Sequence, residues 1–140
     1  MESRITIITL GVVDVTRSTK FYRDGLGLVA VRDDASYAVF KTAGTRLALY
    51  PLDKLAEDVA PGTPIAKGFG GITLAHNVRQ KKEVAEILAL AEKAGGKIVK
   101  PPQDVFWGGH SGYFSDPDGY LWEVAWAADF KFNAAGELEV

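Results

Sequence analysis

The chain has no cysteine and only two histidines, His76 and His110, among its 140 residues. Disulfide bridges and thiolate metal sites are therefore excluded, and any metal would have to be held by His, Asp or Glu. The sequence also lacks an apolar run long enough to cross a membrane. These absences predict a soluble globular protein with few possible metal ligands.

The chain also lacks an excess of either charge. Its formal net charge is -2, and acidic and basic residues are interspersed. We therefore expect no contact with nucleic acid or with an anionic membrane. The first residues, MESRITIITL, have neither the basic start nor the small-residue cleavage site of a secretory signal. This absence predicts a cytoplasmic protein.

What the chain does contain is one motif written twice. ITLGVVDV at 8–15 and ITLAHNVR at 72–79 are short apolar runs of the kind that strands prefer, and a helical pattern follows each. In the first half, Asp14 or Thr16 is expected to cap the helix, and Gly25 or Gly27 to end it. The second helix has its apolar residues at helical spacing and is expected to stop at the Gly-Gly pair 95–96; those residues are Val84, Ile87, Leu88 and Ala91.

Three further strands are predicted in each half: LVAVRD, SYAVFK and TRLALYP in the first, and KIVK, SGYFS and YLWEVAW in the second. The turn DPDG has the residues that a type I turn selects, so Ser115 and Tyr120 should flank it. We therefore predict an α+β fold of two βαβββ modules that form one curved mixed sheet with a cleft, since neither half can cover its sheet alone.

The predicted boundaries divide a single domain of 1–140 into module 1 at about 5–51, a linker at 52–69, module 2 at about 70–127 and a tail at 128–140. The linker is rich in Pro and Gly and is expected to be a tether, with a lid over the cleft as the alternative. In the tail, Phe130 and Phe132 alternate with polar residues, which suits an edge strand or a surface that faces a partner.

Glu123 is a single carboxylate inside the apolar run LWEVAW. Strand alternation places Glu123 toward the cleft and Trp122 and Trp126 on the opposite face. A carboxylate there has to be paired, protonated or used in chemistry. It is expected either to be paired with a nearby cation or hydroxyl, or to accept a hydrogen bond from a ligand, or to act as a general base; the candidate partners are Thr9, Arg46, Thr73 and Tyr113.

The loop PPQDVFWGGHSGYF concentrates aromatic residues around three glycines just before the DPDG turn. Phe106 and Trp107 are expected to form a stacking clamp for a flat organic molecule, or else to be core plugs. His110 lies in the same loop and could reach the cleft. No phosphate loop or dinucleotide fingerprint is present, because GFGG at 68–71 precedes a strand and no helix follows it.

The paired halves, the pattern VDVTRSTKFYRDGLGL and the pattern FSDPDGYLWEV resemble the vicinal oxygen chelate superfamily, which includes glyoxalase I, extradiol dioxygenases and bleomycin resistance proteins. The resemblance covers about residues 5–126. It implies a cleft in which metal-dependent members hold a divalent ion through His or Glu on the first and last strands of each half. It also implies homodimers, because members commonly complete their clefts across two chains.

Of the four ligand positions that the resemblance implies, only Glu123 carries a suitable group. Leu49 is expected to match Glu123 in the first half, and Ile7, with Thr9 nearby, takes the place on the first strand. Gly71 or Ile72 stands there in the second half. His76 is expected to point to the opposite face of its strand. Catalytic zinc usually has three protein ligands, so we expect no metal or other cofactor, with a divalent metal as the alternative.

The leading hypothesis is a protein of the glyoxalase and bleomycin resistance type that binds a small hydrophobic or aromatic molecule in its cleft without a metal. The alternative is a lyase, isomerase or dioxygenase that uses Glu123 as base or metal ligand and His110 as acid or second ligand; a third is a module that mainly dimerises. Residues expected to line the ligand site are Thr9, Leu49, Thr73, Phe106, Trp107 and Tyr113.

Overall fold

The computed structural model describes residues 1–139, so Val140, the last residue of the predicted tail, lies outside the described part. The fold is α+β, as predicted, with two four-stranded mixed sheets. The chain divides between Gly70 and Gly71 into two compact units, and each is described by itself. No helix among the described residues is long and apolar enough to cross a membrane.

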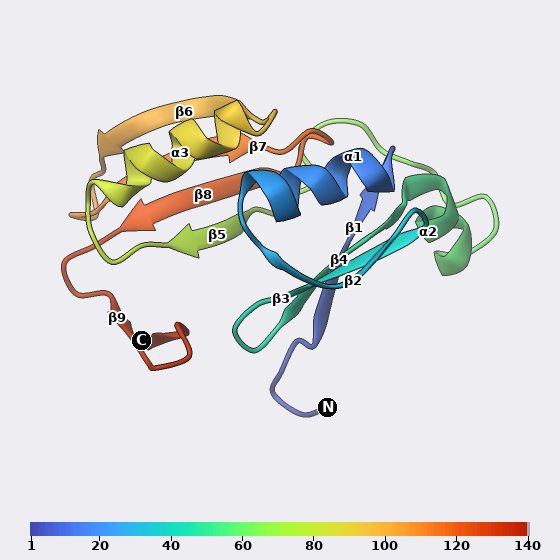
Figure 1. The fold of residues 1–140 in the computed structure, drawn as a ribbon, viewed down its shortest axis with the longest axis horizontal. Coiled ribbons are helices and arrows are strands. Elements are labelled where there is room, and N and C mark those ends of the chain that lie inside the picture. The colour runs from blue at the N-terminus through green and yellow to red at the C-terminus, as the bar shows by residue number, and fades with distance from the viewer. Residues whose placement is uncertain (140) are drawn as a thin grey trace. The chain divides into compact units, whose positions relative to one another are not determined.

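The first unit is a sheet in the order β1-β4-β3-β2, in which β1 runs parallel to β4 and the other neighbours are antiparallel (Figure 1). Its elements are β1 (Ile7–Val12), α1 (Val15–Lys20), the π-helix η1 (Phe21–Gly25), β2 (Val29–Asp34), β3 (Tyr37–Lys41), β4 (Arg46–Pro51) and α2 (Leu52–Val59). This is the predicted βαβββ order, followed by a helix that was not predicted.

Helix α1 begins where the sequence allowed two candidates. Asp14 is the cap, because its carboxylate accepts a hydrogen bond from the backbone N–H of Arg17 at 2.9 Å. The chain continues into η1, where Phe21 and Tyr22 are buried, and the Tyr22 ring lies 5.8 Å from that of Phe40 on β3. The sheet face that carries Phe40 is therefore the helix-covered core of this unit.

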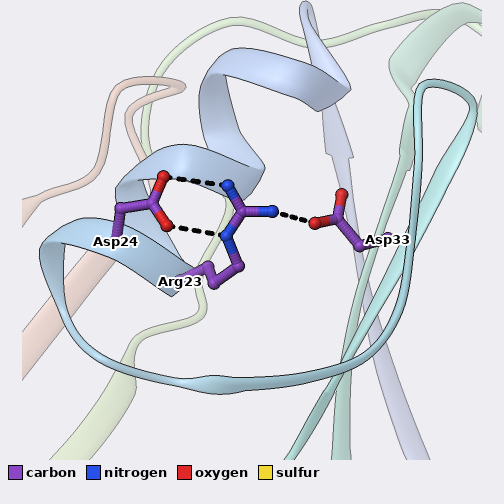
Figure 2. Close-up of polar contacts among 3 residues, drawn as sticks. All are labelled: Arg23, Asp24 and Asp33. Carbon is purple, nitrogen blue, oxygen red and sulfur yellow. Dashed lines mark hydrogen bonds and ion pairs between the residues drawn. The ribbon is translucent and has the colours of Figure 1, made fainter.

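Arg23 ties η1 to the outer strand β2 (Figure 2). Its guanidinium donates two hydrogen bonds to Asp24, at 2.7 and 2.9 Å, and a further one to Asp33. The hydrogen bonds to Arg23 lower the pKa of Asp24. Because two carboxylates already occupy this guanidinium, the cluster is a structural bracket and leaves Arg23 little capacity to bind an anion.

Helix α2 occupies the first part of the stretch that was expected to be a linker. A Cβ added to Gly11 would lie 2.6 Å from Leu52 Cδ1 and 3.2 Å from Leu55 Cδ2, so the helix rests directly on the backbone of β1. Gly11 lies between Leu10 and Val12, whose side chains are buried on the other face. Helix α2 therefore covers the end of the face opposite α1, which a plain tether would not do.

The second unit has the same strand order in its own sheet, β5-β8-β7-β6, with β5 parallel to β8. Its elements are β5 (Leu74–Asn77), α3 (Glu83–Lys93), β6 (Lys97–Asp104), β7 (His110–Ser115), β8 (Leu121–Trp126), β9 (Lys131–Phe132) and β10 (Leu138–Glu139). Strands β9 and β10 form a separate antiparallel hairpin within the predicted tail, and Arg79 stacks over the Phe132 ring at 4.6 Å.

Helix α3 covers one face of this sheet (Figure 1). Gly112 on β7 faces the helix, since a Cβ there would lie 2.5 Å from Leu88 Cδ1. Phe114 and Val124 are buried on that face, and Phe114 stacks on Trp122 with ring centroids 6.1 Å apart. The predicted alternation of β8 is therefore present, with Trp122 toward the helix and Glu123 on the other face.

The outer strand β6 is irregular. Its register against β7 shifts between Ile98 and Lys100 and again between Lys100 and Gln103, and the prolines 101 and 102 lie within the second shift. A proline cannot donate a ladder hydrogen bond, so it is confined to outer strands or bulges. The bulges change which residues of β6 stand opposite β7.

The DPDG turn between β7 and β8 is built around Asp116. This buried carboxylate accepts hydrogen bonds from the backbone N–H groups of Asp118, at 3.0 Å, and Tyr120, at 2.8 Å. Gly119 has φ of +93°, a conformation that favours glycine. Ser115 flanks the turn as predicted, but its partner in the hairpin ladder is Leu121, because Tyr120 accepts a hydrogen bond from the backbone N–H of Asp116 inside the turn.

Thr19 provides a test of the first core. Its hydroxyl in α1 is buried and has no hydrogen-bond partner among the described residues. An unpaired buried hydroxyl costs free energy, so Thr19→Val, which keeps the shape, should raise the free energy of unfolding by about 1 kcal/mol. Urea denaturation measures this change. The control Thr16→Val, at an exposed position of the same helix, should shift it by less than about 0.5 kcal/mol; a loss of stability in Thr19→Val would contradict this account.

Candidate functional site

Glu123 lies on β8 directly opposite Tyr113 of β7, on the sheet face that α3 leaves uncovered. Of the two candidate partners that lie in this unit, Thr73 and Tyr113, it is Tyr113 whose side chain interacts electrostatically with Glu123. Burial raises the pKa of Tyr113, and the charge and hydrogen bond of Glu123 raise it further. The phenol therefore stays neutral and can act as a donor at neutral pH.

A cation completes the row across the sheet. Lys100 of β6 stands opposite Tyr113, and its Nζ lies 5.8 Å from the centre of the Tyr113 ring. On the other side of Glu123 the neighbour is Ala75 of β5, which carries no polar group. From β6 to β5 the face thus presents a cation, a phenol, a carboxylate and a methyl group. We call Lys100, Tyr113 and Glu123 the polar row.

On one side of the polar row the same face carries Ser115 and Leu121, and on the other side it carries two small residues. Ala125 and Ser111, next along β8 and β7, form a register pair and are 3% and 1% exposed. Thr73 precedes β5 and is exposed. The structure therefore places Tyr113 and Glu123 together, and it gives Thr73 no described hydrogen bond to them.

His110 does not share a face with Glu123. It lies two residues before Gly112, whose Cβ direction points at α3, so the His110 side chain lies on the helix-covered face. Its Nδ1 is 2.7 Å from Oδ1 of Asp104. The same oxygen forms an ion pair with Nζ of Lys81 at 2.6 Å. Hydrogen bonds from Lys81 and then from His110 lower the pKa of Asp104. His110 thus braces the base of the loop, and the expected pairing of His110 with Glu123 is not present.

The aromatic loop lies between the paired residues Asp104 and His110. The backbone N–H of Val105 donates to the carbonyl of Gly109, and the N–H of Gly108 donates to the carbonyl of Val105, both at 3.0 Å. Phe106 at its tip is fully exposed, and Trp107 is 45% exposed. A Cβ at Gly109 would lie 1.7 Å from the Trp107 ring, so the indole rests on this glycine. Neither aromatic side chain is a core plug, and both are available to a ligand or a partner.

Leu49 and Thr9 occupy opposite faces of the first sheet. If Phe40 and Phe114 correspond, Leu47 corresponds to Trp122, because these are their register partners, and Ala48 corresponds to Glu123. The prediction that Leu49 matches Glu123 was therefore wrong by one residue, since the turn after β3 is one residue shorter than the DPDG turn. Leu49 is fully buried in the helix-covered core, whereas Thr9 pairs with Ala48 and is exposed.

The residues present do not fit the divalent metal that the family resemblance implies. Among residues 1–139, no three or more His, Asp or Glu side chains gather closely enough to hold an ion. Ile7 pairs with Arg46, and Gly71 and Ile72 precede β5. His76 pairs with Val124 on the helix-covered face, where burial lowers its pKa. Glu123 therefore has no second ligand in its own sheet.

Sequence reasoning missed Lys100. Regular pairing back from Ile98 and Phe114 would place Val99 opposite Tyr113, and only the bulge puts Lys100 there. The sequence feature that could have indicated this bulge is the Pro-Pro pair at 101 and 102, because proline disfavours a regular strand ladder.

The Tyr113–Glu123 contact can be measured by titration. The raised pKa of Tyr113 means that the folded chain keeps this proton above pH 10.0, where the unfolded chain loses it, so this contribution to stability declines as the pH rises past that point. Glu123→Gln removes the charge and should lower the pKa of Tyr113. Ultraviolet absorbance of phenolate, with Tyr113→Phe to assign the signal and Glu86→Gln as the charge control, tests this; an unchanged titration in Glu123→Gln would refute the contact.

Comparison with solved structures reveals three informative likenesses. A glyoxalase-related enzyme from Fulvimarina pelagi is 33% identical, with a TM-score of 0.91 over 99% of this chain and 98% of that chain. A lactoylglutathione lyase from Agrobacterium tumefaciens is 25% identical, with a TM-score of 0.67 over 89% and 93%. A glyoxalase/bleomycin resistance protein/dioxygenase from Nocardioides is 25% identical, with a TM-score of 0.72 over 92% and 86%.

Among functionally curated proteins, none matches the chain. A family model, in contrast, matches residues 4–124, which include both sheets up to the middle of β8. The duplicated strand order and the DPDG hairpin lie within this span. The chain therefore belongs to the Glyoxalase/Bleomycin resistance protein/Dioxygenase superfamily.

Proposed function

We propose that this protein binds a small hydrophobic or aromatic molecule, without a metal, on the uncovered face of its second sheet. The observation that supports this is the position of Glu123, whose carboxylate lies opposite the Tyr113 phenol and has Ala75, which offers no metal ligand, on its other side in the sheet. Cations need several donor atoms, while an organic ligand needs one well-placed acceptor and apolar surface.

The side chains around Glu123 suit such a ligand. The Tyr113 ring offers a flat surface, and the exposed methyl group of Ala75 lies beside the carboxylate. One carboxylate oxygen can accept a hydrogen bond from a ligand hydroxyl or N–H while the phenol occupies the other. Trp107 and Phe106, at the end of the β6–β7 hairpin, are candidates for stacking.

Calorimetric titration with 2-naphthol in the presence of EDTA tests this proposal. We expect saturable binding that Glu123→Gln weakens several-fold, because a neutral amide is a poorer acceptor than a carboxylate. The control Glu86→Gln, which changes an exposed position of α3, should bind like the wild type. Binding that appears only after a divalent metal is added, or tight one-to-one zinc occupancy that Glu123→Gln abolishes, would overturn the proposal.

The alternative function is a lyase, isomerase or dioxygenase of the glyoxalase type, with Glu123 as a general base. The similarity to the lactoylglutathione lyase supports this class. His110 cannot be its acid across the sheet, but the neutral phenol of Tyr113 is a donor beside the base. The same Glu123→Gln variant separates the two functions, because an enzyme would lose turnover while a binding protein would lose affinity.

We also propose a homodimer in the cytoplasm. Large apolar side chains are exposed on both units, among them Ile5, Phe106 and Trp107, while Trp126, Phe130 and Phe132 are only partly buried. Such surface is commonly covered by a partner, and family members commonly pair. Light scattering at micromolar concentration should give the mass of two chains; the mass of one chain would count against the dimer.

A further inference from the structure

We propose that the preferred ligand is a flat aromatic molecule with two polar ends, an anionic group for Lys100 and a hydrogen-bond donor for Glu123, with its ring against Tyr113. This inference rests on the proposed function and specifies its ligand class. It follows from the order of three unlike groups along one line of the sheet.

Lys100 is the residue that would bind the anionic group of the ligand. Within the described residues its ammonium forms no ion pair, and its one described partner is the Tyr113 ring. The other lysines that could compete are differently placed: Lys81 is bound to Asp104, and Lys97 stands opposite Ser115. A half-buried, unneutralised cation beside an aromatic ring favours a carboxylate or a similar anion.

Glu123 is the residue that would bind the hydrogen-bond donor at the other end of the ligand. Its carboxylate lies opposite Tyr113 in the ladder and has lone pairs that can accept a hydrogen bond from a ligand donor. Lys100 and Glu123 belong to strands on either side of β7, so their backbones are separated by two strand spacings, about 10 Å. A single aromatic ring system with a short acidic arm spans that distance once the two side chains lean toward it.

The order of the groups also excludes simpler ligands. A purely apolar molecule would leave the Lys100 ammonium and the Glu123 carboxylate desolvated without compensation. A cationic amine can bind Glu123 but leaves Lys100 without an anion, and a dianion would meet Glu123 at its other end. A molecule with unlike ends in the stated orientation satisfies both groups.

Calorimetry with three indoles of similar shape tests the inference: indole-3-propionate carries the anion and the N–H, 3-methylindole lacks the anion, and tryptamine replaces it with a cation. We expect indole-3-propionate to bind best, because it alone offers an anion to Lys100 together with an N–H for Glu123. Lys100→Met keeps the apolar stem over Tyr113 and should weaken indole-3-propionate about tenfold or more, to the level of 3-methylindole, because a charged hydrogen bond is lost. Lys97→Met removes the same charge from the same strand and should have little effect.

The outcomes separate the two proposals. Equal affinity for indole-3-propionate and 3-methylindole, or a preference for the acid that survives Lys100→Met, would overturn the ligand class while the metal-free binding function stands. Failure of all three indoles and of 2-naphthol to bind would overturn both. Matched thermal melting of the two lysine variants ensures that a loss of affinity is not a loss of fold.

Discussion

The pairing of Tyr113 with Glu123 across β7 and β8 is the interaction on which the interpretation of this protein depends. It resolves how a strand made of Leu, Trp, Val and Ala accommodates a carboxylate: the charge has a neutral phenol as its partner and leaves the apolar core to the other face. Burial, together with the charge of Glu123, keeps the phenol protonated by raising the pKa of Tyr113. A half-buried carboxylate thus has a neutral donor opposite it.

Much of the architecture could be predicted, because the duplicated pattern determines which segments are strands and which are helices. Two apolar strand runs, each followed by a helix and three strands, led to the α+β fold that the structure has. The alternation in LWEVAW predicted the direction of Glu123, since a regular strand turns every second side chain to the same face. The Asp14 cap and the DPDG turn were likewise local, and their chemistry is readable from neighbouring residues.

The site was harder to predict, because it depends on register. Leu49 was assigned to the wrong face by one residue, since the lengths of the two turns differ and a shift of one reverses every side chain. His110 was expected in a loop, but it is the first residue of β7. Because it lies two residues before Gly112, its side chain is on the face that α3 covers. Lys100 joins the site through a bulge that no periodic pattern encodes. Strand register and bulges depend on how the strands pair in the folded protein, and the spacing of residues in the sequence does not determine them.

The two adjacent prolines of β6 have a consequence for how this chain meets others. An outer strand with free N–H and C=O groups is a template on which a foreign strand can grow, and repeated growth leads to fibrils. Pro101 and Pro102 remove two consecutive N–H donors from β6, of which a regular strand would turn one to the outer edge, and the bulges around them interrupt the regular strand. Main-chain pairing of another strand along β6 is thereby discouraged, so any contact that this edge makes with another protein has to rest on its side chains.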